Sequence, residues 1–310
     1  MLDEAFGSRP RGRAIPRTVF GEGPLTLDAK DGYRLGITLT RSRSNGPPVG
    51  VLVVAGAMAV PASRYQKLAT FFAKAGYHVF TFDYRGIGRS LTGSIRGHRA
   101  TLHEWGELDL ASVLAHAEAE FPALPAFFLG HSVGGQLFGL VPPGRVRAAA
   151  LFASQSGYFG HWSGAGGVVM QTLWQVVPAL ASACGYLPMK ALGQGVDVPR
   201  DVAREWAKWG RDPRYILQWV ESREQEKPEV AFASYDGSLR VYSFSDDIYA
   251  PKRAVAALAS AYERAEKAHI HLEPPDVGKS KIGHFAILRD AYEATLWTSA
   301  LGFFTDSVAR

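Results

Sequence analysis

One serine stands in a glycine-flanked segment directly after a short apolar run. Residues 126–129 (Ala-Phe-Phe-Leu) lead into Gly130-His-Ser-Val-Gly134, and Pro142 limits the helix that can follow. A G-x-S-x-G segment between a strand and a helix is the pattern of a nucleophile elbow, where a tight turn lifts the serine above the sheet. The pattern predicts Ser132 as a nucleophile. The alternative is a serine in a purely structural glycine turn.

A serine hydroxyl needs a histidine that takes its proton and a carboxylate that orients the histidine. In elbow folds the chain order is serine, acid, histidine. Three histidines follow the candidate acids. His269 and His271 are two residues apart in a predicted strand, whereas His284 lies in a loop after the last strand, where an imidazole can reach over the sheet edge. We therefore predict His284 as the base.

Two aspartates compete for the role of the acid. Asp246 and Asp247 both follow a predicted strand over residues 239–244, and the turn after that strand places a carboxylate beside the histidine loop. We expect one of the two to cap the helix that follows Pro251. Asp247 is the favoured triad acid, with Asp246 as the alternative.

The elements that must position these residues alternate between short apolar runs and helical patterns. This alternation predicts an α/β fold with a mostly parallel sheet flanked by helices. An antiparallel β entry is expected over residues 23–39. Strands are predicted at 51–54, 78–83, 126–129, 148–153, 239–244 and 268–272, and helices at 65–75, 104–120, 252–262 and 292–304.

Residues 156–235 interrupt this alternation with a helix-like, tryptophan-rich segment. Strands resume after it, so we predict a helical cap inserted over the carboxyl edge of the sheet, where open α/β folds bind ligands. The predicted division is a hydrolase core over 1–155, a cap over 156–235 and the rest of the core over 236–310. Some of the cap tryptophans are expected to face a substrate and others to pack the cap.

The composition is that of a globular protein, with 47% hydrophobic residues, 20% charged residues and a net charge of +5. Four arginines near the start (Arg9, Arg11, Arg13 and Arg17) are too sparse for a nucleic-acid tail, so a solvated arm is expected. The single cysteine, Cys184, fits a reducing, cytoplasmic setting. We expect no signal peptide. The charge-free stretch 148–189 is interrupted by glycines and Pro178, which favours a buried or cleft-lining segment over a membrane span.

These residues together resemble the α/β-hydrolases, close to the serine aminopeptidase S33 and monoacylglycerol-lipase-like branch. The segment Asp83-Tyr-Arg-Gly-Ile-Gly-Arg-Ser90 is similar to the family's D-x-R-G-x-G-x-S turn, and residues 130–135 match its elbow. An aspartate four residues before a proline is the family's usual acid, which supports Asp247. Gly283-His284-Phe285 matches its histidine loop, and the resemblance implies a lid over 156–235.

The chain departs from the family after the third strand. The family usually has His-Gly there, whereas this chain has Ala55-Gly-Ala-Met58. The oxyanion hole uses backbone N–H groups from this loop and from the residue after the nucleophile, so the change removes no donor. We predict Val133 and Ala57 as the donors, with Met58 as the alternative to Ala57.

The predicted function is therefore a serine esterase that cleaves carboxylic esters of a small or medium, largely apolar acyl group through an acyl-enzyme. An acyltransferase or thioesterase on the same triad is the alternative, and a catalytically silent ligand-binding protein is a further one. Phosphate-loop, dinucleotide and zinc-protease motifs are missing from the sequence, so no cofactor and no metal are expected. The expected partner is a small-molecule ester. We expect no nucleic acid and no integral membrane span, and an exposed apolar cap could serve a homodimer or a membrane surface equally well.

Overall fold

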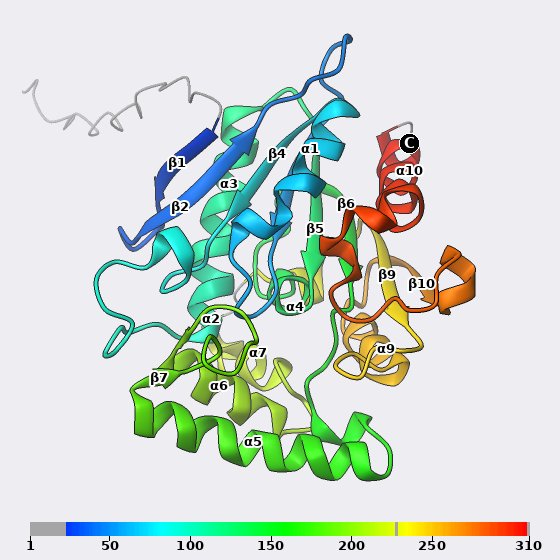
Figure 1. Ribbon diagram of the computed structural model, residues 1–310. Coiled ribbons are helices and arrows are strands. Elements are labelled where there is room, and N and C mark those ends of the chain that lie inside the picture. Colours follow the sequence, from blue (N-terminus) through cyan, green and yellow to red (C-terminus); the bar gives the residue numbers. More distant parts are fainter. Residues whose placement is uncertain (1–22, 227–228, 309–310) are drawn as a thin grey trace, which may run out of the picture.

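An eight-stranded sheet forms the centre of the computed structural model, which describes residues 23–226 and 229–308 (Figure 1). The strand order is β1-β2-β4-β3-β5-β6-β9-β10. The first two strands form an antiparallel entry and β2 also pairs antiparallel with β4, whereas all other neighbours are parallel. The predicted mostly parallel α/β sheet is confirmed. The arginines of the N-terminal arm lie outside the described residues. The strands are β1 (Gly23–Asp28), β2 (Arg34–Thr40), β3 (Gly50–Ala55), β4 (Tyr77–Phe82), β5 (Ala126–His131), β6 (Val146–Phe152), β9 (Ser238–Phe244) and β10 (Glu266–Leu272).

The central strands are buried along their whole length because helices cover the sheet on both sides. Every residue of β3, β4 and β5 is buried, as expected for parallel strands between helical layers. Helix α1 (Gln66–Lys74) contacts β4, and α3 (Ala111–Glu120) contacts β3. Helix α9 (Lys252–Ser260) contacts β9, and α10 (Thr298–Val308) contacts β6.

Two predicted helices differ from expectation near their start. The helix expected over 104–120 begins earlier, at α2 (Leu102–Glu104), because Thr101 and Glu104 form a capping box. It then passes through a π-helical stretch, Trp105–Leu110, before α3. The closing helix expected over 292–304 likewise opens with a π-helical stretch, Glu293–Trp297.

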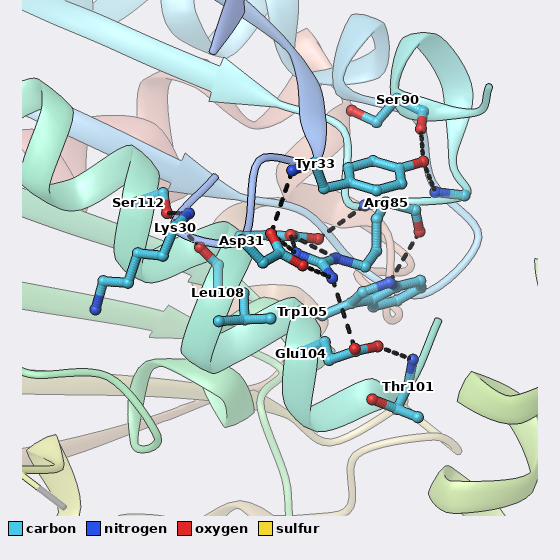
Figure 2. A network of polar contacts seen from close by, with 12 residues as sticks. Lys30, Asp31, Tyr33, Arg85, Ser90, Thr101, Glu104, Trp105, Leu108 and Ser112 are labelled. Carbon is cyan, nitrogen blue, oxygen red and sulfur yellow. Dashed lines mark hydrogen bonds and ion pairs between the residues drawn. The ribbon is translucent and has the colours of Figure 1, made fainter. Parts of the chain in front are cut away.

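The turn after β4 is anchored by a buried arginine (Figure 2). The Arg85 guanidinium donates to Asp31 at 2.8 and 3.1 Å and to Asp109, and it lies 3.6 Å from Glu104. Burial raises the pKa of Asp109 to about 6, although the neighbouring Arg85 opposes this shift. The network fixes the position of the turn that contains Asp83.

Asp83 connects this turn to the loop after β3. Its Oδ1 accepts the Ala62 backbone N–H at 2.7 Å, and its Oδ2 accepts that of Arg89 at 2.9 Å. The motif D-x-R-G-x-G-x-S thus supports the loop that follows the third strand, which is the loop expected to carry an oxyanion donor.

Between β6 and β9 the chain forms a group of helices below the carboxyl ends of the parallel strands (Figure 1). Helices α5 and α6 pack against each other. We call this group the cap segment. It contains α5 (Ala165–Cys184), β7 (Tyr186–Leu187), β8 (Val198–Pro199), α6 (Arg200–Gly210), α7 (Leu217–Ser222) and α8 (Ala231–Ser234).

Helix α5 is apolar on both its inner and its outer side. Trp174, Val177 and Ala181 are buried, whereas Val168 and Val169 are each 64% exposed. By length and composition alone, this helix could cross a membrane. The charge-free stretch is therefore cleft-lining on one face, as expected, but its other face lies on the surface.

Candidate active site

Ser132 lies at the tip of a strained turn between β5 and α4 (Val133–Phe138). Its backbone has φ 51° and ψ −117°, a conformation that side-chain-bearing residues seldom adopt. The turn requires Gly134, because a Cβ there would lie 2.2 Å from the Ala55 carbonyl oxygen. A Cβ on Gly130 would likewise lie 2.5 Å from the Gly135 Cα. The two flanking glycines of the motif are therefore steric requirements of this turn.

His284 and Asp247 complete a hydrogen-bonded row with Ser132. The His284 Nε2 lies 2.9 Å from Ser132 Oγ, and its Nδ1 lies 2.8 Å from Asp247 Oδ2. All three residues are buried, although Ser132 keeps 7% exposure on the side of a pocket. With the Nδ1–H donated to Asp247, Nε2 is free to accept the serine proton. The arrangement can deprotonate Ser132 and stabilise the imidazolium that results.

The two neighbouring aspartates have different partners. Asp247 Oδ1 accepts the backbone N–H groups of Tyr249 and Ala250, so its second oxygen faces His284. Asp246 instead accepts the N–H groups of Ile282 and Gly283 at 2.8 and 2.9 Å and thereby holds the histidine loop. Neither aspartate caps α9, whose N-cap is Pro251 without a side-chain hydrogen bond, so that expectation is wrong.

The remaining two candidate histidines lie away from this row. His269 and His271 both hydrogen-bond Ser243 Oγ at 2.8 Å, across the β9–β10 pair. They share one face of β10, as their spacing predicts. They stabilise the edge of the sheet.

In the loop after β3, the backbone N–H of the favoured donor is already engaged. The Ala57 N–H donates to the Tyr65 hydroxyl at 2.8 Å. Within the described residues, the N–H groups of Met58 and Val133 have no acceptor. Both Ala57 and Met58 line the pocket that contains Ser132. Of the two predicted loop donors, Ala57 thus has an engaged N–H and Met58 an open one.

Tyr65 also connects this loop to the catalytic histidine loop through His131. The His131 Nε2 lies 2.9 Å from the His284 carbonyl oxygen and must donate to it, so Nδ1 accepts the Tyr65 hydroxyl proton at 2.8 Å. Burial, together with the neighbouring His284, lowers the pKa of His131 to about 3, so its ring is neutral. Nothing in the sequence pointed to Tyr65, because only the fold brings it to His131, 66 residues along the chain.

A largely apolar pocket of about 370 Å³ opens above Ser132. Helix α5 supplies most of its outer wall, and tryptophans 162, 174 and 206 contribute to it, so part of the predicted tryptophan set lines the pocket. Trp209 and Trp219 do not: Trp209 is buried within the cap segment, and Trp219 stacks on His103. Gln155 is the one pocket-lining amide that is buried, at 5% exposure.

Comparisons with known proteins place this geometry in a family context. The model of the serine aminopeptidase S33 family matches residues 46–190. The structure superimposes on that of a monoglyceride lipase from Saccharomyces cerevisiae with a TM-score of 0.66, at 15% identity over 94% of this chain and 97% of the other. The chain has the α/β-hydrolase fold. The resemblance to the S33 and monoacylglycerol-lipase-like branch, predicted from the motifs, is confirmed.

Two curated relatives match this chain over a limited segment. A monoacylglycerol lipase of Mycolicibacterium smegmatis is 39% identical over 107 residues, which are 34% of this chain and 37% of the relative. The human monoglyceride lipase is 29% identical over 98 residues, 31% of this chain and 30% of the relative. The matched segment thus spans about a third of each curated relative.

Proposed function

We propose that this α/β-hydrolase is a serine hydrolase that cleaves carboxylic esters with a largely apolar acyl group. The observation that carries the proposal is the row Ser132–His284–Asp247, whose two hydrogen bonds of 2.9 and 2.8 Å lie at the floor of an apolar pocket. The lipase relatives over part of the chain support the same reaction class.

In this mechanism Ser132 Oγ attacks the ester carbonyl carbon while His284 Nε2 takes its proton. Asp247 stabilises the imidazolium, and the N–H groups of Met58 and Val133 hold the oxyanion. His284 then returns the proton to the leaving alkoxide, which gives an acyl-enzyme on Ser132. Water, deprotonated by His284, attacks this ester, and His284 returns the proton to Ser132 Oγ as the acid is released. Each oxyanion donor in such a site contributes about 2.7–4 kcal/mol to lowering the barrier.

The pocket supports an apolar acyl group because its walls are mostly aliphatic and aromatic carbon. We propose that α5 serves as a wall of this pocket rather than as a membrane span, because Trp174, Val177 and Ala181 fix its inner face to the protein. A small-molecule ester is thus the proposed partner, in a cytoplasmic setting and with no cofactor. The proposed cap role of residues 156–235 follows from the same contacts.

The proposal is tested with p-nitrophenyl esters from acetate to palmitate and with Ser132→Ala as the matched variant. We expect kcat in the variant to fall by about 10³-fold or more, because removal of a triad serine removes the nucleophile. A fluorophosphonate probe should label the wild type and not the variant. Equal rates in both proteins, or absence of labelling, would contradict the proposal. Repeating the assay with an added alcohol or thiol separates hydrolysis from acyl transfer to another acceptor.

A further inference from the structure

The loop that carries the triad acid is tied to the walls of the substrate pocket by two side-chain donors. Trp162 Nε1 donates to the Ile248 carbonyl at 2.8 Å, and Gln155 Nε2 donates to the Tyr249 carbonyl at 3.0 Å. Both donor residues line the pocket above Ser132. Two consecutive carbonyls directly after Asp247 are thus held by residues that a bound acyl group would contact.

These two bonds matter because the apex of the acid loop is largely exposed, apart from the Tyr249 ring that packs against His284 and Phe285. Ile248 is 74% exposed and Tyr249 is 41% exposed. The N–H groups of Tyr249 and Ala250 donate to Asp247 Oδ1, so the backbone at 249 and 250 helps to set the direction of the carboxylate. A shift of this backbone would move Asp247 Oδ2 relative to His284 Nδ1.

Gln155 is itself held by a relay that reaches into the cap segment. Gln155 Oε1 accepts from Gln136 Nε2 at 3.3 Å, and Gln136 Oε1 accepts the Tyr215 hydroxyl proton at 2.7 Å. The Tyr215 oxygen in turn accepts from Trp206 Nε1 at 3.1 Å. Gln136, Gln155 and Tyr215 are each at least 95% buried. The relay therefore runs from the pocket-lining Trp206 to the backbone beside the triad acid.

Both glutamines occupy sites where an apolar side chain would avoid the cost of burying an amide. Burial of an amide is offset only by its hydrogen bonds, so a relay in which each member has a partner restricts the whole group to one arrangement. The relay fixes the amide orientation of Gln155, because Oε1 must face Gln136 and Nε2 must face the Tyr249 carbonyl.

We propose that Gln155 and Trp162 are positioning residues that hold Asp247 in line with His284 through the backbone of residues 248–249. The inference rests on the proposed function, since it assigns Asp247 the role of triad acid. Neither residue touches the reacting atoms through these bonds. Both act through the acid loop, so their loss affects the chemical step more than the binding of substrate.

Gln155→Met and Trp162→Phe test this inference, because each removes the N–H donor to the acid loop. Gln155→Met also removes the Oε1 acceptor of Gln136 and so breaks the relay at that point. Loss of one such bond should lower kcat by about three- to ten-fold with p-nitrophenyl acetate and octanoate alike, with KM within about two-fold of the wild type. Gln66→Met is the matched control. It removes the bond from Gln66 Nε2 to Thr40 Oγ1 at the end of β2. Neither residue lines the pocket above Ser132, so both constants should stay unchanged.

Hydrogen exchange supplies a readout that does not depend on activity. The amides of Tyr249 and Ala250 should exchange faster in Gln155→Met and in Trp162→Phe than in the wild type or in Gln66→Met. A change in KM that grows with acyl length, at unchanged kcat and unchanged exchange, would overturn the inference and leave both residues as simple pocket walls. Failure of the proposed function gives a different result, since the wild type would then lack Ser132-dependent hydrolysis while the exchange effect could still be measured.

Discussion

Replacing Tyr65 by phenylalanine removes one hydroxyl that satisfies two buried groups on either side of the active site. The Ala57 N–H loses its acceptor and His131 Nδ1 loses its donor, at 2.8 Å each. The ring itself is 1% exposed and keeps its packing in the variant. The substitution therefore isolates the connection between the oxyanion loop and the histidine loop.

The expected magnitude follows from the neutral character of both bonds. A buried donor or acceptor without a partner costs about 1–3 kcal/mol, and two such groups arise here. Slight movement of the loop relieves part of this cost, so we expect the free energy of unfolding to fall by about 2–4 kcal/mol. Complete loss of an oxyanion donor costs about 10²–10³-fold in kcat. Because Met58 would be displaced rather than removed, we expect kcat to fall by about 10–100-fold.

Urea unfolding and steady-state hydrolysis of p-nitrophenyl butyrate measure these two effects. Tyr84→Phe is the matched control, because the Tyr84 hydroxyl is buried without a hydrogen-bond partner in the described part of the chain. Its removal should change neither kcat nor, by more than about 1 kcal/mol, the unfolding free energy. If Tyr65→Phe kept the wild-type kcat, or if both variants lost the same stability, the assigned role of Tyr65 would be refuted.

Three further outcomes are expected. His131 has a pKa lowered from 6.5 to about 3, so the unfolded chain binds the extra proton first; its contribution to stability is complete above pH 6.5 and is lost as the pH falls towards 3. Over this pH range the free energy of unfolding of the wild type should fall by up to about 5 kcal/mol more than that of His131→Gln. Urea unfolding at stepped pH measures both, and parallel dependences of the two free energies on pH would contradict this. Gly134→Ala places a Cβ 2.2 Å from the Ala55 carbonyl oxygen, so it should lower the free energy of unfolding by at least about 1–3 kcal/mol and remove most esterase activity. Gly302→Ala, with open space around it, is the control and should keep both stability and activity in thermal unfolding and ester assays. Met170→Trp fills part of the pocket and should lower kcat/KM for octanoate about ten-fold or more while sparing acetate; equal effects on both esters would place Met170 outside the acyl path.

The sequence alone predicted the order of the elements and pointed to Ser132 and His284, which the structure places 2.9 Å apart. Local chemistry carries this information: an apolar run of four residues followed by G-x-S-x-G permits few conformations other than a strand and a tight turn. The family resemblance added the choice of Asp247 through its spacing to Pro251. In the structure Asp247 lies 2.8 Å from His284, whereas Asp246 accepts a backbone N–H of the histidine loop.

Tertiary structure decided which backbone donor is open and how the cap meets the core. Ala57 and Met58 are equivalent by sequence, because every residue of the loop carries an N–H; only the fold brings the Tyr65 hydroxyl onto Ala57 and leaves Met58 free. The contacts of Gln155 are equally invisible in the chain, since its partners Gln136 and Tyr249 are 19 and 94 residues away. Hydrogen bonds between distant residues depend on packing of whole elements, whereas periodicity and turn chemistry report only on neighbours along the chain.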